Sequence, residues 1–206
     1  MSRLTLYGDL VSGNCLKTRW TADRLGLDYD WIDIDVVAGG ARTDEFLAIN
    51  PAGQVPCAVL ADGRLLAQSN AIILHLAELA ASDLLPTDPY DRAKMFEWLF
   101  WEQYSHEPYI AVRRFQKKFL NKADAEMEPK LLAGGRRALG LMERTLLAGD
   151  YFVGEALSLA DISLVAYTRL AHEGGFDLDE FPQVREWVFR VERELDIEHA
   201  LALEIA

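Results

Sequence analysis

The N-terminal part of the chain changes from a two-residue period of hydrophobic positions to a helical one and back. Residues 3–8 (RLTLYG) alternate apolar and polar side chains, which predicts a β-strand. Residues 14–25 repeat apolar side chains at helical spacing, and Gly26 follows as a typical helix end. Residues 28–37 (DYDWIDIDVV) predict a second strand. Its apolar phase flips after Trp31, which favours a bulge or a strand buried on both faces.

A hairpin and a second helix are predicted next. Residues 55–60 (VPCAVL) and 64–69 (RLLAQS) flank Asp62–Gly63, a two-residue turn signal typical of a β-hairpin. Ser69 is a suitable N-cap for a helix over residues 70–81. Strand, helix, strand, hairpin and helix follow one another in the order of a thioredoxin-like fold.

The segment SDLLPTDPYD ends this alternation of strands and helices. It contains two prolines and three aspartates in a short stretch, which is typical of a linker, and strand signals do not return after it. We therefore predict a thioredoxin-like α/β domain at 1–81, a linker at 82–89 and an all-helical domain at 90–206.

Two long helices are predicted early in the second domain. Residues 90–120 are helical in pattern, with a kink expected at Pro108. Residues 126–147 form a second helix. In it Gly134 and Gly135 cost about 1 kcal/mol each relative to alanine, so we expect close packing there. Five side chains of the first helix fall on one side: Trp98, Trp101, Ser105, Tyr109 and Val112.

A capping box begins the next helix. In Ser158-x-x-Asp161, each side chain is placed to reach the backbone N–H of the other residue. We therefore interpret Asp161 as a residue that builds the fold rather than as a catalytic acid. A last amphipathic helix is predicted over 181–195.

Charge and composition exclude several classes of function. The 206 residues carry a net charge of −12, so we expect no nucleic-acid partner. The basic pairs Arg113–Arg114 and Lys117–Lys118 are expected to form the solvated face of a helix. No apolar run approaches the roughly 20 residues of a membrane span, so no membrane partner is expected.

The cysteines and histidines point to a cytoplasmic protein without a metal. The start of the chain lacks the apolar core of a signal peptide, and two cysteines, Cys15 and Cys57, are too few for a disulfide framework. The four histidines are scattered, and no Cys/His cluster has the spacing of a zinc site. We expect no metal cofactor.

Four local features together indicate a family. A thioredoxin-like fold carries a reactive Cys-x-x-Cys pair where the first strand turns into a helix, and here Ser12 and Cys15 occupy those places. The other features are NPAGQVPCAVL, AQSNAI and the SLADI capping box. In this order and spacing they resemble the cytosolic glutathione transferase family over essentially the whole chain. The SGNC turn and the EQYSHEPYIAV segment look most like bacterial members.

The resemblance implies a glutathione site in the first domain. It implies a cis peptide between Val55 and Pro56, with the Val55 backbone pairing with the tripeptide as an added strand does. It places the γ-glutamyl end of glutathione at Gln68 and Ser69, where a helix N-terminus favours a carboxylate. Gln54 and Arg42 are the candidates for the glycyl carboxylate.

Three residues of the first turn are candidates for contact with the glutathione sulfur. Ser12 would donate a hydrogen bond that favours the thiolate, which is the reactive form of a thiol. Asn14 has an amide donor and occupies a place where some bacterial relatives use asparagine. Cys15 is a candidate for a mixed disulfide with glutathione, or else a small buried apolar residue.

The helical domain is expected to supply the second substrate's pocket. Tyr104, His106 and Tyr109 are the candidates for it, or else contribute to the core or to subunit contacts. The resemblance implies a homodimeric detoxification enzyme that adds glutathione to a small hydrophobic electrophile. The alternatives are a glutathione-dependent disulfide reductase and a non-catalytic glutathione-binding or stress-regulatory module.

Overall fold

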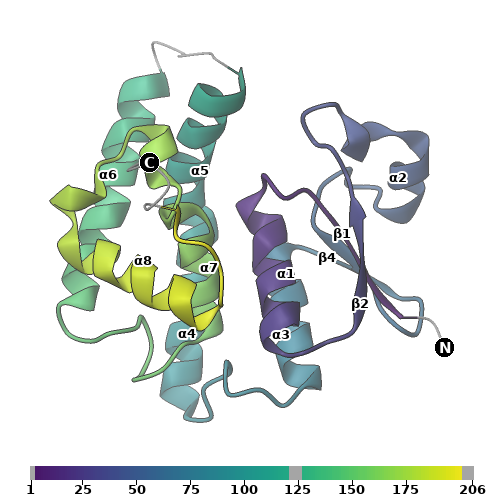
Figure 1. The fold of residues 1–206 in the computed structure, drawn as a ribbon, viewed down its shortest axis with the longest axis horizontal. Helices are drawn as coiled ribbons and strands as arrows, with labels where there is room; N and C mark the ends of the chain where they lie inside the picture. The colour runs from purple at the N-terminus through teal and green to yellow at the C-terminus, as the bar shows by residue number, and fades with distance from the viewer. Residues whose placement is uncertain (1–2, 121–126, 201–206) are drawn as a thin grey trace. The chain divides into compact units, whose positions relative to one another are not determined.

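A computed structural model describes residues 3–120 and 127–200 of the chain (Figure 1). The chain divides into two compact units, Met1–Leu85 and Pro86–Ala206. The division falls inside the segment 82–89 that the sequence marks as a linker. The first unit is a four-stranded sheet with helices, and the described part of the second is helical. The predicted fold class, a thioredoxin-like domain followed by an all-helical domain, is confirmed.

The sheet of the first unit has the strand order β2-β1-β3-β4. Strand β1 (Leu4–Gly8) runs parallel to β2 (Tyr29–Asp33) and antiparallel to β3 (Cys57–Val59). Strand β4 (Leu65–Ala67) is joined to β3 by the predicted hairpin and pairs antiparallel with it. The end of β1, where the chain enters the first helix, therefore lies in the middle of the sheet.

Helices cover both faces of this sheet. Helices α1 (Gly13–Arg24) and α3 (Ser69–Leu79) pack against each other and lie side by side in Figure 1. They share one buried cluster with the sheet: Leu6, Ala22, Ala58, Ile72 and Leu76. Helix α2 (Asp44–Ile49) contributes Phe46 to the cluster on the opposite face, where it packs with Cys57 and Tyr7. Successive strand residues thus alternate between the two clusters, as side chains in a β-strand do.

The second strand is shorter than predicted. It ends at Asp33, at the edge of the sheet, and pairs only with β1. Ile32 is 40% exposed, so the strand is not buried on both faces. The bulge or two-sided burial expected from the apolar phase is wrong, because β2 pairs with β1 in unbroken register and Ile32 is exposed.

The second unit begins with a long helical segment that contains two π-helical stretches. Helix α4 (Pro89–Trp101) continues through a π-helical turn (Glu102–His106) into α5 (Glu107–Phe115). A second π-helical turn (Gln116–Leu120) follows. Pro108 lies in the first turn of α5, where proline is tolerated, and the π-helical turn lies just before it. The kink expected at Pro108 stays a prediction, and the structure shows a π-helical turn that ends two residues before it.

Three more helices complete the described part of this unit. They are α6 (Met127–Leu146), α7 (Leu159–Thr168) and α8 (Pro182–Glu194), with short 3-10 turns at Ala171–Gly174 and Leu178–Glu180. The first residue of the predicted helix 126–147 lies outside the described residues. Within 3–120 and 127–200, no helix is both long and apolar enough to cross a membrane.

Helix α7 is buried along its whole length, and Asp161 in its first turn fixes its start. One oxygen, Oδ2, accepts from the backbone N–H of Ser158 at 3.0 Å and from its hydroxyl at 2.8 Å. The other, Oδ1, accepts from the N–H of Phe152 at 3.1 Å and from Nε1 of Trp187 at 3.0 Å. Asp161 therefore joins three segments of the helical unit, as expected of a residue that builds the fold.

The basic residues of the long helix are not a solvated face. Arg113 and Arg114 are only 4% and 6% exposed, and they pair with Glu128 and Glu173 respectively. Lys118 also pairs with Glu173. The expectation of a solvated basic face is wrong for the arginine pair. The carboxylates that accept these cations come from segments distant in sequence, so the local pattern gives no sign of them.

Candidate functional site

The turn between β1 and α1 is held by Asp9. The carboxylate of Asp9 accepts hydrogen bonds from the backbone N–H of Val11 at 3.0 Å and of Val36 at 2.9 Å. Its backbone carbonyl accepts from the N–H of Ser12 at 3.1 Å. Ser12 is half-buried and is the N-cap of α1. Its hydroxyl therefore lies at the positive end of the helix dipole, where a developing negative charge is favoured.

Cys15 lies in the first turn of α1 and is fully buried. Burial raises the pKa of its thiol to about 11, and the hydrogen bond with the Ser12 side chain only partly opposes this. Cys57 is also buried, and burial likewise raises the pKa of its thiol to about 11. A thiol with such a pKa is protonated at neutral pH, which argues against Cys15 as the nucleophile.

We expect both cysteines of the folded protein to resist alkylation by iodoacetamide at pH 8. With a pKa of about 11, only about one thiol in a thousand is ionised at that pH, and burial also blocks the reagent. Mass spectrometry after timed quenching measures the reaction, and the same protein in guanidinium chloride, where both thiols react, is the control. Rapid native alkylation of Cys15 would restore it as a candidate nucleophile.

Asn14, Lys17 and Ser69 form a polar cluster that joins the first turns of α1 and α3. The Oδ1 atom of Asn14 accepts from Nζ of Lys17 at 2.8 Å and from the hydroxyl of Ser69 at 2.9 Å. Lys17 is fully buried, and Ser69 is only 5% exposed. Sequence reasoning missed Lys17. Lys17 follows Asn14 by three residues, so the two side chains lie on the same face of α1. This spacing is the signal that the sequence offered.

The start of α3 differs from the prediction. Gln68, not Ser69, is the N-cap, and Ser69 is the first helical residue. The Ser69 hydroxyl is engaged with Asn14 rather than with the helix backbone. Gln68 is exposed and has φ 74° and ψ 120°, a conformation that costs a non-glycine residue about 1–3 kcal/mol. Backbone strain of this kind clusters at ligand sites.

The loop before β3 is organised by Asn50, a second residue that the sequence analysis did not single out. Asn50 is 3% exposed, its Nδ2 donates to the carbonyl of Gln54 at 2.7 Å, and its Oδ1 accepts from the N–H of Ala52 at 3.2 Å. Val55 is half-buried, and the Val55–Pro56 peptide is cis, as the resemblance implied. The Asn50 side chain thus links the two ends of the turn that precedes Val55.

Arg42 lies beside the same loop. A Cβ atom added to Gly53 would stand 2.6 Å from Nη1 of Arg42, so the guanidinium rests against the loop where glycine leaves room. Arg42 and Gln54 are both exposed. The two candidates for the glycyl carboxylate are thus on neighbouring, solvent-facing positions of the first unit.

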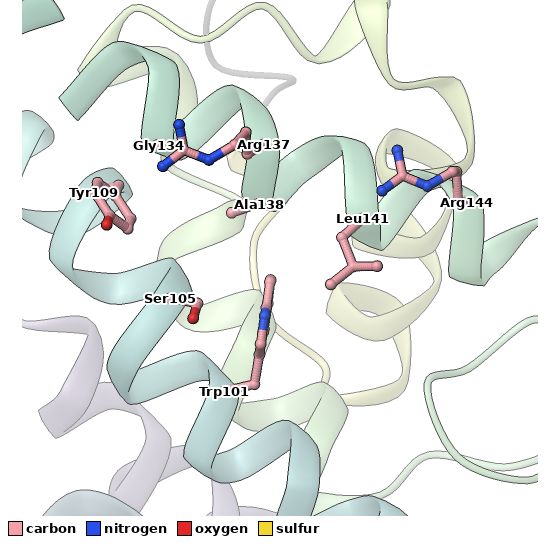
Figure 2. Close-up of a pocket in the computed structure, with 8 residues that line it drawn as sticks. All are labelled: Trp101, Ser105, Tyr109, Gly134, Arg137, Ala138, Leu141 and Arg144. Atoms are coloured by element: carbon pink, nitrogen blue, oxygen red, sulfur yellow. The ribbon is translucent and has the colours of Figure 1, made fainter. Parts of the chain in front are cut away.

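The three aromatic candidates of the helical unit are not brought together. Tyr104 is 84% exposed. His106 is fully buried, with its Nε2 atom 2.9 Å from the hydroxyl oxygen of Thr168, so it does not line an open pocket. Tyr109 lines a cavity between the long helix and α6 (Figure 2). The three candidates therefore differ in their surroundings: one is on the surface, one is in the core and one lies beside a cavity.

Among the described residues, no group of three or more His, Cys, Asp or Glu side chains is arranged to hold a metal ion. The side chains at the β1–α1 turn and the start of α1 offer carboxylate, hydroxyl, amide, amine and thiol groups. Both cysteines are free thiols.

Comparison with known proteins identifies the family. Residues 11–79 match the model of the glutathione S-transferase N-terminal domain, and residues 96–194 match that of the C-terminal domain. Glutathione S-transferase 3 of Zea mays is 32% identical over 168 residues, covering 78% of this chain and 75% of the relative. Protein URE2 of Eremothecium gossypii is 27% identical, covering 91% of this chain and 64% of that protein. The crystal structure of a glutathione S-transferase from Pseudomonas fluorescens Pf-5 matches with a TM-score of 0.88 and 44% identity, covering 93% of this chain and 95% of the other. The chain belongs to the glutathione S-transferase family.

Proposed function

We propose that this protein is a glutathione transferase that binds glutathione in the first unit and activates its thiol for attack on a small hydrophobic electrophile. The observation that carries the proposal is the hydrogen bond between Ser69 and Asn14 at 2.9 Å. It joins the first turn of α3 to the first turn of α1, the helix for which Ser12 is the N-cap. Glutathione carries a thiol and a γ-glutamyl carboxylate. A site for it therefore needs one group for the thiol, at the start of α1, and one for the carboxylate, at the start of α3.

Ser12 is the group that we propose to activate the thiol. A hydroxyl has one proton to donate and two lone pairs to accept hydrogen bonds. Ser12 can therefore accept from the Cys15 thiol while it donates to the sulfur of glutathione. A donated hydrogen bond and the N-terminus of α1 both favour the thiolate over the thiol. Asn14 is the second candidate for this contact.

The other proposed contacts with glutathione run from its γ-glutamyl end to its glycyl end. Ser69 and the strained residue Gln68 are proposed to hold the γ-glutamyl group. The backbone of Val55, ahead of Pro56, is proposed to pair with the cysteinyl part as an added strand does. Gln54 and Arg42, exposed on neighbouring positions, are proposed to meet the glycyl carboxylate.

An ultraviolet titration tests the proposal. We expect the thiolate band of protein-bound glutathione to persist at pH 7, about one to two units below the pKa of a free thiol. In Ser12→Ala the pKa of bound glutathione, read from the titration of this band, should rise by about one unit, because one stabilising hydrogen bond to the thiolate is lost. Turnover at pH 7 should then fall about three- to fivefold, as the ionised fraction of bound glutathione falls, with little change in glutathione affinity.

The outcomes separate the rival functions. If Ser12→Ala keeps the wild-type band, Asn14 becomes the leading candidate for contact with the sulfur. No band in the wild type, with glutathione still bound, would favour a non-catalytic binding module. A band accompanied by reduction of small mixed disulfides, without conjugation of halogenated arenes, would favour the disulfide reductase.

The electrophile, the oligomer and the compartment stay predictions. Tyr104 and Tyr109 remain candidates for contact with a hydrophobic second substrate, whereas His106 is buried away from any such contact. A homodimer in the cytoplasm is the form that we propose for the active protein.

A further inference from the structure

The carboxylate of Asp9 continues the contact between β1 and β2 beyond the end of the sheet. Gly8 pairs with Asp33 at the end of the parallel ladder, and the N–H of Ile34 donates to the Gly8 carbonyl at 2.8 Å. Two residues on, the N–H of Val36 donates to Oδ2 of Asp9 at 2.9 Å. A side-chain oxygen therefore ties the chain that follows β2 to the chain that follows β1.

The other oxygen of Asp9 shapes the turn that leads to Ser12. Oδ1 accepts from the N–H of Val11, two residues on, at 3.0 Å, which is the geometry of an Asx turn. The backbone carbonyl of Asp9 accepts from the N–H of Ser12 at 3.1 Å and closes a four-residue turn, whose first position favours aspartate. Three oxygen atoms of one residue thus hold three backbone N–H groups around this turn.

The position of the Ser12 hydroxyl depends on this turn. A serine N-cap usually accepts from an N–H of the first helical turn, but the Ser12 side chain makes no such bond within the described helix α1. Its hydroxyl instead contacts the thiol of Cys15, and the backbone N–H of Asp9 contacts the same sulfur. The hydroxyl is therefore placed by the turn and by Cys15, not by capping of its own helix.

We propose that Asp9 is a positioning residue that does not touch glutathione but holds the turn that presents the Ser12 hydroxyl to the glutathione sulfur. This inference rests on the proposed role of Ser12 and adds a residue to it. The bond to Val36 also connects the two ends of the proposed site, because the chain after Val36 leads to the 3-10 turn that ends at Arg42, a candidate for the glycyl carboxylate.

The negative charge of Asp9 opposes this positioning effect. Burial is the main reason why the pKa of the Cys15 thiol is raised, and the charge of Asp9 adds to the rise. A thiolate held by Ser12 would meet the same repulsion. Removal of the charge alone must therefore lower the pKa of bound glutathione, whereas displacement of the Ser12 hydroxyl must raise it. The sign of the change separates the two effects.

Ultraviolet titration of bound glutathione in Asp9→Asn, with and without Ser12→Ala, tests the proposal. Asparagine keeps the size of the side chain but turns an NH2 group toward one of the two N–H groups, so one tie is lost. We expect the pKa of bound glutathione to rise by about half a unit in Asp9→Asn. In the Ser12→Ala background the same substitution should lower this pKa by about 0.3 unit, because only the effect of the charge remains.

Asp35→Asn is the matched control. It removes the same charge from the exposed chain after β2, but the Asp35 carboxylate accepts from the N–H of Ala38 within its own turn. We expect this control not to raise the pKa of bound glutathione. Asp9→Ser is the second variant in case Asp9→Asn does not fold, because a serine carries no NH2 group and can still accept from the N–H two residues on. The same two signs are expected for it.

The reversal of sign between the two backgrounds is the result that supports a positioning role. A fall in the pKa of bound glutathione in both backgrounds would reduce Asp9 to its charge. An equal rise in both would show that Asp9 does not act through Ser12. Weaker glutathione binding with an unchanged pKa would leave it a purely structural tie. Each of these results overturns the proposal. A wild type that binds glutathione without a thiolate band would instead overturn the proposed transferase function, and this inference with it.

Discussion

Replacing Asp161 by asparagine is expected to lower the free energy of unfolding by about 3 kcal/mol, although the side chain keeps its size. Burial raises the pKa of the Asp161 carboxyl above its ordinary value, and hydrogen bonds from Trp187, Phe152 and Ser158 oppose this shift. Each carboxylate oxygen accepts two of these bonds. An asparagine NH2 group must replace one oxygen and then faces donors instead of acceptors.

The less costly orientation of the asparagine still leaves a defect. With NH2 toward Ser158, the serine hydroxyl can turn to accept, but the Ser158 backbone N–H remains buried without an acceptor. Urea denaturation followed by fluorescence and circular dichroism measures the loss. Ser158→Ala is the matched comparison, expected to cost only about 1 kcal/mol because one hydroxyl bond is removed. Equal stability of Asp161→Asn and the wild type would contradict the structural role.

Asp161 also illustrates why part of this fold could be predicted from sequence. The capping box is a local signal, since both of its residues lie within one helical turn. The start of α7 is therefore encoded by a few adjacent side chains. The same holds for the hairpin at Asp62–Gly63 and for α8, whose apolar stripe gives its ends to within about one residue.

The predictions from sequence fail where a residue's environment depends on a partner far away in the sequence, or where a helix is very short. Helix α2 was not predicted, although Thr43 caps it and Asp44 and Glu45 occupy its first turn. A helix of six residues offers too little periodicity to detect. Arg114 was expected in solvent because its partner, Glu173, lies in another segment.

The candidate site divides in the same way. Ser12 and Ser69 could be proposed from the sequence because each stands at a turn into a helix, which a local pattern reveals. Lys17 and Asn50 were missed because their roles depend on tertiary contacts. In the sequence alone, a lysine inside an amphipathic helix is normally a solvated residue. Only the packing of α1 against α3 shows that the Lys17 side chain is fully buried beside Asn14.

Substituting Lys17 by methionine is expected to raise the KM for glutathione about 30-fold while kcat at saturating glutathione changes less than about threefold. In the proposed complex, Ser69 donates its single hydroxyl hydrogen to the γ-glutamyl carboxylate of glutathione and therefore no longer donates it to Asn14. Lys17 then holds the Asn14 amide in place, and its buried charge favours the bound anion. Steady-state kinetics with glutathione varied at fixed electrophile measures both constants.

Arg24→Met is the control for this substitution, because Arg24 is exposed in the last turn of α1 and its loss makes the same change in net charge. We expect it to leave both constants unchanged. Methionine matches the length of the lysine stem, so Lys17→Met removes charge with little change in packing. A fall in kcat equal to the rise in KM would indicate that Lys17 acts on the sulfur rather than on the carboxylate. An unchanged KM would show that the buried lysine serves only the packing of α1 against α3.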